Sequence, residues 1–185
     1  ILELEGIEYA RENIWLTYKD GDNHPIPRVT KIIGQNRDQD YLIQWAANIG
    51  RRKYDFYRDK ALTVGTIVHE SIEQYLTCKY ITHTPFEMDY DEIDMMYRAQ
   101  VFNALESFKL WEQHLGACGC KITKIIGIEV PLFCPWFGGT ADIIFEINGA
   151  VYIGDFKTSK AISPDYLIQA AAYMWIVNNG YAPNI

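Results

Sequence analysis

The chain has no long hydrophobic run, since none of its apolar stretches reaches the roughly 18 residues that a transmembrane helix needs. It also lacks the pattern of a secretory signal peptide. No internal repeat or low-complexity linker is present. These absences predict a soluble protein with no membrane partner.

Positive charge is scarce as well, because 17 Lys and Arg residues stand against 24 Asp and Glu residues, for a net charge of −7. This balance is not typical of a general nucleic-acid-binding protein. The positive charge is local instead, with its densest group in residues 51–60. A basic groove on an acidic protein can still hold phosphates, so charge alone leaves the partner open.

Cysteine is sparse, and the four residues form no CxxC pair and no regular framework: Cys78, Cys118, Cys120 and Cys134. Their spacing predicts reduced thiols rather than a disulfide scaffold. A zinc site built from the Cys118-Gly119-Cys120 segment with Cys134 or His83 stays open as an alternative.

Core-forming residues are abundant, since 49% of the chain is hydrophobic and 14% aromatic, which indicates a globular protein. Hydrophobic periodicity predicts helices first, then three β segments, then a final helix that begins at Ser163-Pro164 and ends before Gly180. The expected helices span about 29–60, 66–79 and 91–115, and the expected strands span about 121–131, 139–147 and 151–157. This order predicts an α/β fold with a mixed central β-sheet flanked by helices.

The predicted organisation is an N-terminal, partly helical extension over 1–64 and a core domain over 65–185. A further strand is expected to cover the edge of the sheet after Gly180, where few residues follow. We therefore expect the final strand to be missing or truncated.

The most informative feature is the dipeptide Asn148-Gly149 between two β segments, which strongly favours a two-residue hairpin turn. With these residues as the loop, the register places Asp142 directly opposite Asp155. Opposed residues have Cβ atoms about 5 Å apart, and like charges there are destabilising. A divalent cation between the carboxylates would remove this repulsion.

Lys157 follows Asp155 by two residues, so it projects from the same face of the strand. Two acids and a lysine on one face indicate a catalytic metal site. The alternative is the ordinary solvated face of an antiparallel hairpin. Ile144 and Ile153 share this face, which predicts a hairpin covered on both sides with the acids at one end of a buried sheet.

Other polar residues lie where they could join this site. Glu129 ends the preceding strand, and it faces either the site or water. His69 and Glu73 share one helix face at i, i+4, as do Gln169 and Tyr173. Each also has an ordinary explanation, since a lone helical histidine is more often structural and a polar pair can be simple surface.

Taken in order, five motifs resemble the PD-(D/E)XK nuclease superfamily, and within it the RecB-like exonuclease branch. They cover residues 65–173 and read Gly65-Thr66-Ile67-Val68-His69-Glu70-Ser71-Ile72-Glu73, Glu129-Val130-Pro131, Gly139-Thr140-Ala141-Asp142, Asp155-Phe156-Lys157-Thr158 and Gln169-Ala170-Ala171-Ala172-Tyr173. Each motif alone is weak, whereas five in register are specific. Residues 27–33, followed by Leu42 and Trp45, look like the lead-in of phage and mitochondrial genome-maintenance exonucleases of this branch.

The resemblance implies a restriction-endonuclease-like core with a metal site. Asp142 and Asp155 would hold the metal ion, with His69 and the backbone carbonyl of Phe156 completing its coordination. Lys157 would orient or deprotonate the attacking water.

The resemblance also implies roles around that site. Glu129 would bind a second metal ion or accept a hydrogen bond beside the first. Gln169 and Tyr173 would position the nucleic-acid strand.

The implied function is that of a metal-dependent DNA exonuclease, which hydrolyses phosphodiester bonds in single-stranded or end-bearing DNA during repair, recombination or replication. Oxygen-rich ligation suits Mg²⁺ or Mn²⁺ as the cofactor. The expected location is the cytoplasm, that of the host if a phage encodes the chain, or alternatively the mitochondrial matrix. Some relatives carry an iron–sulfur cluster, but the cysteines here lie between the histidine and Gln-Tyr motifs, so no cluster is expected.

Two rival functions use the same fold. An endonuclease would share the chemistry and differ in substrate access. A non-catalytic nucleic-acid-binding module would keep the fold alone, and the intact Asp142, Asp155 and Lys157 argue against it.

Basic and aromatic residues alternate within residues 51–60, beginning at Arg51 and Arg52. Such a segment suits a single strand whose phosphates meet the cations while bases stack on rings, as would Lys160 near the hairpin. It would then roof the site and admit a threaded strand, giving exonuclease action. The alternative is an amphipathic helix with ordinary buried aromatics.

Overall fold

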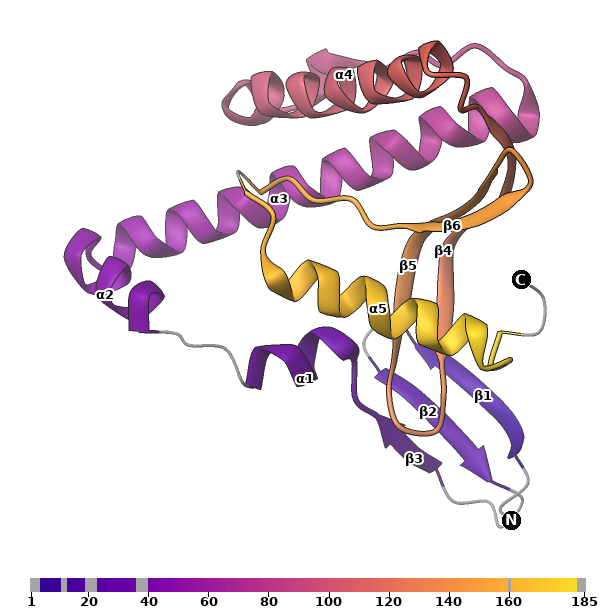
Figure 1. Ribbon diagram of the computed structural model, residues 1–185. Helices are drawn as coiled ribbons and strands as arrows, with labels where there is room; N and C mark the ends of the chain where they lie inside the picture. The colour runs from indigo at the N-terminus through magenta and orange to yellow at the C-terminus, as the bar shows by residue number, and fades with distance from the viewer. Residues whose placement is uncertain (1–3, 11–12, 19–22, 36–39, 160, 183–185) are drawn as a thin grey trace.

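The chain folds around two three-stranded sheets and five α-helices (Figure 1), in a computed structural model that describes residues 4–10, 13–18, 23–35, 40–159 and 161–182. The first sheet contains β1 (Leu4–Ala10), β2 (Asn13–Tyr18) and β3 (Asn23–Ile26). The helices α1 (Val29–Gln35), α2 (Asp40–Ile49) and α3 (Arg51–Leu76) follow, then α4 (Met95–Ala117). The second sheet contains β4 (Ile122–Phe133), β5 (Gly138–Ile147) and β6 (Ala150–Gly154), and α5 (Pro164–Asn178) follows it. The predicted α/β class is confirmed.

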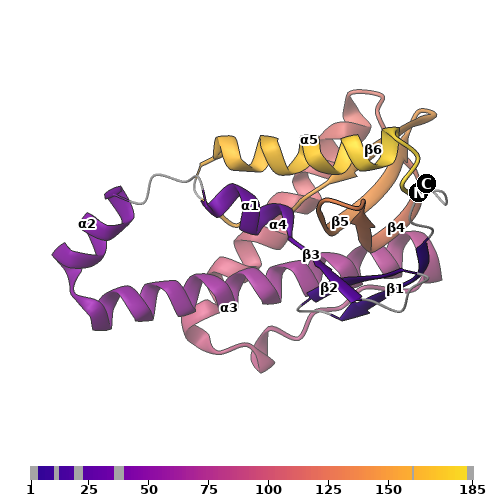
Figure 2. The same cartoon turned by 90° about the horizontal axis from the view of Figure 1, so that it is seen from below.

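The second sheet lies between two helical layers, with α5 on one side and α3 on the other (Figure 2). On the α3 side, Ile143 and Phe145 of β5 join a buried cluster with Val68 and Leu105. On the opposite side, Ile144 packs in a second cluster with residues of α1 and α5. The expectation that the hairpin is covered on both faces is therefore confirmed for β5, whereas Val151 and Tyr152 of β6 are about half exposed.

The hairpin register is the predicted one. Ile147 pairs with Ala150, and the ladder continues to Ile143 opposite Gly154. Asn148 and Gly149 have φ angles of 50° and 85°, the left-handed conformation that a tight hairpin turn of this type requires. Because β6 ends at Gly154, Asp155 lies just beyond the ladder, on the loop that leads to α5.

The second sheet is antiparallel throughout the described residues, so the prediction of a mixed sheet is wrong for this part of the chain. Its strands follow one another through short hairpins, which pair neighbours antiparallel. A parallel neighbour would need a crossover connection, and beyond α5 the described chain ends at residue 182. An isolated parallel bridge joins Arg28 to Gly138 at the start of β5.

Helix α3 runs without a break through Gly65, so the expected start of a separate helix there is wrong. The predicted domain boundary thus falls inside one helix. A single glycine costs a helix about 1 kcal/mol relative to alanine. Val64, Val68 and Ile72 continue one buried stripe on both sides of Gly65, and this burial offsets that cost.

The N-terminal extension contains β-structure as well as the predicted helices. Strands β1 to β3 form an antiparallel sheet of their own. The chain leaves this sheet alongside β5, because the Gly138 amide donates a hydrogen bond to the Pro27 carbonyl at 3.1 Å. Within the described residues, none of the helices combines the length and apolar character needed to cross a membrane.

Candidate metal centre

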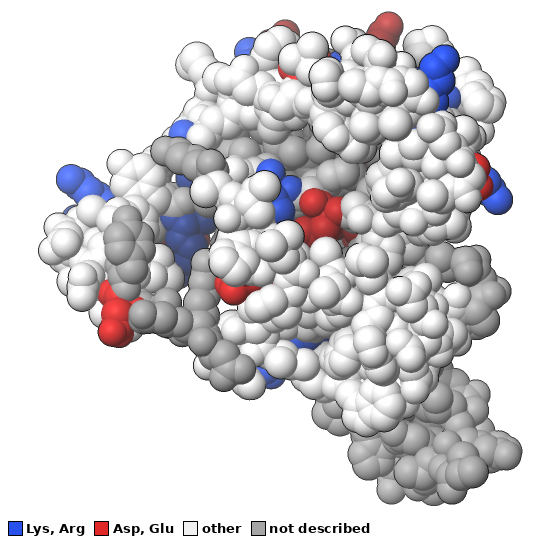
Figure 3. Space-filling view, viewed as in Figure 1, with Lys and Arg blue, Asp and Glu red and all other residues white. Residues whose placement is uncertain are grey.

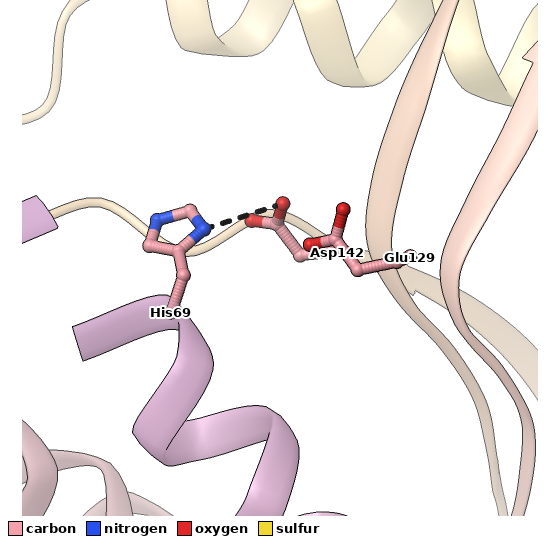
Figure 4. Close-up of side chains that lie close together, drawn as sticks. All are labelled: His69, Glu129 and Asp142. Carbon is pink, nitrogen blue, oxygen red and sulfur yellow. Dashed lines mark ion pairs between the residues drawn. The ribbon is translucent and has the colours of Figure 1, made fainter. Parts of the chain in front are cut away.

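Three different elements bring metal-ligating side chains to one point. His69 comes from α3, Glu129 from β4 and Asp142 from β5, and one donor atom of each lies within 4.8 Å of the other two. Figure 4 shows the His69 imidazole facing the Asp142 carboxylate, with Glu129 beside it. The prediction that His69 faces the carboxylates is confirmed.

Glu129 reaches this point through an unusual backbone conformation. Its φ is 51°, in the left-handed region that residues other than glycine rarely adopt. The pairs on either side, Ile128 with Ile143 and Val130 with Ala141, place Glu129 across from Asp142. Non-glycine residues held in this region cluster at functional sites, and the position of Glu129 fits that pattern.

Asp142 is 92% hidden from solvent, and protein groups bond both of its oxygens. The Phe156 amide donates a hydrogen bond to Oδ2 at 2.5 Å, and His69 Nδ1 lies 3.5 Å from Oδ1. The hydrogen bond with Asp142 raises the pKa of His69, although burial opposes it, and contact with the Phe156 backbone adds to the increase. The Asp142 carboxylate thus anchors both the histidine and the loop after β6.

Asp155 lies near this group but is held by different partners. Lys157 Nζ is 2.6 Å from Oδ2, and the Gln169 amide donates to Oδ1 at 3.0 Å. Burial raises the pKa of Asp155 most, Lys157 opposes this, and the negative charge of Asp142 raises it further. Repulsion between the two aspartates is therefore present, as the hairpin register predicts, but Asp155 is not among the three clustered donors.

The clustered donors suit a divalent cation. Metal–ligand bonds of about 2.0–2.2 Å to nitrogen and carboxylate oxygen place ligand atoms at most about 4.4 Å apart, close to the separation found here. Two carboxylates and one imidazole form a donor set that accepts Mg²⁺, Mn²⁺ or Zn²⁺. A pocket of about 440 Å³ opens on His69 and Glu129, so solvent and ligand can reach them.

Gln169 and Tyr173 lie at the interface between α5 and the sheet, and Tyr173 also lines a pocket beside Lys157. Both are buried, at 6% and 2% exposure, on the face of α5 that covers the sheet. Gln169 donates to Asp155 and to the Tyr173 hydroxyl, so the pair holds the Asp155 carboxylate in place. The Tyr173 hydroxyl can lie this close to β5 only because residue 139 is glycine: a Cβ at Gly139 would lie 2.4 Å from the hydroxyl oxygen.

Replacing Gln169 by alanine should weaken Mn²⁺ binding, up to about 10–100-fold, the range typical of residues that orient metal-site ligands. The Asp155 carboxylate would lose the donor that fixes one of its oxygens. Mn²⁺ binding is measured by electron paramagnetic resonance. Gln113→Ala, at an exposed position on α4, is the control. Unchanged Mn²⁺ binding in the Gln169 variant would show that Gln169 does not act through the metal centre.

Only the start of the basic segment 51–60 lies far from the metal centre, because its end adjoins Ala61 and Leu62, which line the pocket at His69. Arg51 and Arg52 begin α3, and at 1.5 Å of rise per residue they lie roughly 25 Å along the helix from His69. Arg51 lies 3.7 Å from Asp55, so part of the local charge is neutralised. Tyr54 packs edge-on against Trp45, whereas Phe56 and Tyr57 are 48% and 51% exposed, so the aromatics of this segment are not simply buried. Lys160 lies outside the described residues.

The cysteines and one buried carboxylate lie outside the metal centre. All four cysteines are free thiols, and none belongs to the described donor group, so the zinc-structured alternative gains no support there. Glu112, which belongs to none of the motifs found in the sequence, is buried on α4 and accepts hydrogen bonds from Tyr75, Lys79 and Tyr80. This network joins α4 to α3 and to the π-helical segment Thr77–Thr82.

Figure 3 shows acidic atoms in a hollow near the middle of one face, with basic atoms beside them.

No protein-family model, no curated protein and no solved structure matches this chain.

Proposed function

We propose that this chain is a metal-dependent nuclease that hydrolyses phosphodiester bonds in DNA, of the RecB-like branch of the PD-(D/E)XK superfamily. The observation that carries the proposal is the meeting of His69, Glu129 and Asp142 beside the Asp155–Lys157 pair. Phosphodiester hydrolysis needs an activated water and neutralised phosphate charge. A donor cluster next to a lysine provides places for both.

His69, Glu129 and Asp142 would hold the cation. Asp155 interacts electrostatically with Asp142 and His69, so its negative charge would also stabilise the cation. A bound Mg²⁺ or Mn²⁺ would lower the pKa of a coordinated water and stabilise negative charge on the phosphate. Side chains of the protein would handle the attacking water. Lys157 Nζ, 2.6 Å from Asp155, would orient the attacking water as a hydrogen-bond donor, and it could accept a proton from that water only after losing its own; Asp155 keeps the lysine in place.

The choice between exonuclease and endonuclease action rests on access to the site. The resemblance favours an exonuclease acting on single-stranded or end-bearing DNA. The endonuclease alternative keeps the same residues and chemistry. End-labelled linear DNA and covalently closed circular DNA, each with Mg²⁺ and with EDTA, distinguish them: we expect Mg²⁺-dependent shortening of linear DNA only. Efficient nicking of the circle would establish the endonuclease instead.

Replacing Lys157 by alanine should lower the rate about 10²–10⁴-fold, the range for loss of a general acid–base group. The Lys157 side chain is partly exposed, and Asp155 keeps its hydrogen bond from Gln169 when the lysine is removed. The fold should therefore survive the substitution. Initial rates on end-labelled DNA at saturating Mg²⁺ measure the effect. Lys124→Ala, an exposed lysine on β4, controls for the lost positive charge. Equal rates for the Lys157 variant and wild type would exclude the proposed role.

A further inference from the structure

A second pocket, of about 450 Å³, opens beside the catalytic lysine. Its walls come mainly from α5 and from the loop between β6 and α5, and they include Ile153, Lys157, Ile162, Tyr166, Leu167 and Ala170. The pocket that opens on His69 and Glu129 is lined by Thr158, whereas this one is lined by Asp155 and Lys157. The segment 155–158 therefore borders both pockets.

The walls of this second pocket are apolar although they face solvent. Leu167 is 66% exposed and Ile162 is 82% exposed, which the packing of α5 on the sheet does not require. Single exposed aliphatic residues are common, but here several of them share one concavity with an aromatic ring. Such a lining accepts a flat, weakly polar group.

Lys157 lines this pocket together with Asp155, whose carboxylate interacts with Asp142 and His69 of the metal centre. The Lys157 ammonium is 5.1 Å from the centre of the Tyr166 ring and 2.6 Å from Asp155. For a phosphate held between the metal centre and Lys157, this pocket would be the neighbouring space for the group attached to the phosphate. In a nucleic acid the attached group is a sugar with its base.

We infer that the pocket walled by Ile162, Tyr166 and Leu167 binds the unpaired nucleobase of the nucleotide next to the scissile phosphate; this inference rests on the proposed nuclease function. Aromatic and aliphatic surfaces bind any base through its flat face, so the pocket favours single strands without selecting sequence. A base inside a duplex is stacked and paired, and it would have to leave the helix to enter. Such a pocket would favour unpaired DNA independently of the basic segment 51–60.

The test compares oligo(dT) with an abasic oligomer of the same length, which keeps the sugar-phosphate chain and lacks every base. Affinities are measured by fluorescence anisotropy in EDTA, where no cleavage occurs. Leu167→Gln and Tyr166→Ala should each weaken oligo(dT) binding about tenfold, within the range for loss of one base contact. Neither should change binding of the abasic oligomer. Leu110→Gln, at a similarly exposed leucine on α4, should leave both affinities within twofold of wild type.

Each outcome decides between distinct conclusions. Unchanged oligo(dT) affinity, or equal losses on both oligomers, overturns the base pocket and leaves the nuclease proposal intact if wild type still cleaves DNA with Mg²⁺. A wild-type protein that neither binds oligo(dT) nor cleaves DNA overturns the proposed function, and the pocket assignment falls with it. Leu167 is largely exposed, so Leu167→Gln tests the pocket even if Tyr166→Ala fails to fold.

Discussion

Asp142→Asn is expected to lower DNA cleavage at least about 10³-fold, because a lost metal ion removes several kcal/mol of transition-state stabilisation and each 1.36 kcal/mol is tenfold. The fold should remain, since asparagine has the same shape and can keep both native contacts. Its amide oxygen can accept from the Phe156 amide, and its NH₂ group can donate to His69 Nδ1. What disappears is the negative charge that a cation requires.

Two measurements separate metal binding from catalysis in this variant. Mn²⁺ binding, followed by electron paramagnetic resonance, should weaken, and the cleavage rate at saturating Mg²⁺ should fall. Glu146→Gln provides the matched control, because it removes one negative charge from the same strand outside the donor cluster. Cleavage by Asp142→Asn within tenfold of wild type would place the metal centre elsewhere.

The hairpin could be predicted from sequence because its determinants are local. Asn148 and Gly149 tolerate the positive φ of the turn, and side chains alternate along each strand. These two facts fix which residues oppose each other and bring Asp142 close to Asp155. The final helix was equally local, since the Ser163 hydroxyl accepts from the Asp165 amide and Pro164 opens the helix.

The roles of polar residues depended on burial, which sequence spacing does not reveal. Gln169 and Tyr173 share a helix face, but the outer face of α5 is the apolar one, with Leu167 and Met174 exposed. A polar pair was therefore expected to face the substrate, whereas it faces the sheet and supports Asp155. Similarly, the sequence does not reveal that Arg51 and His69 belong to one continuous helix, which holds them far apart.

The Glu112 network was beyond prediction for a different reason. Its donors lie 32 to 37 residues earlier in the chain, and no local rule pairs them with this acid. Burial raises the pKa of Glu112, but hydrogen bonds from Lys79, Tyr75 and Tyr80 outweigh it, so the pKa lies below its usual value. Glu112 is therefore a buried carboxylate that stays ionised because its donors are in place.

Glu112→Ala should reduce the free energy of unfolding by about 2–4 kcal/mol, below the top of the range for breaking a buried ion pair because Lys79 is 44% exposed. The variant leaves two tyrosine hydroxyls and an ammonium without their shared acceptor, and it opens a space between α3 and α4. Urea unfolding followed by circular dichroism measures the loss. Glu106→Ala, which removes an ion pair with Lys109 at 2.8 Å on the same helix, should cost about 0.5 kcal/mol or less.

The pH dependence tests whether ionisation of Glu112 is the cause. A carboxyl whose pKa is lowered on folding contributes stability above its unfolded pKa of about 4.3 and loses it as the pH falls through the folded value. Glu112→Gln keeps the shape but not the charge. The difference in unfolding free energy between wild type and Glu112→Gln should therefore be full at pH 7 and shrink below about pH 4.3. A difference that stays constant across this range would assign the effect of Glu112 to packing rather than to its charge.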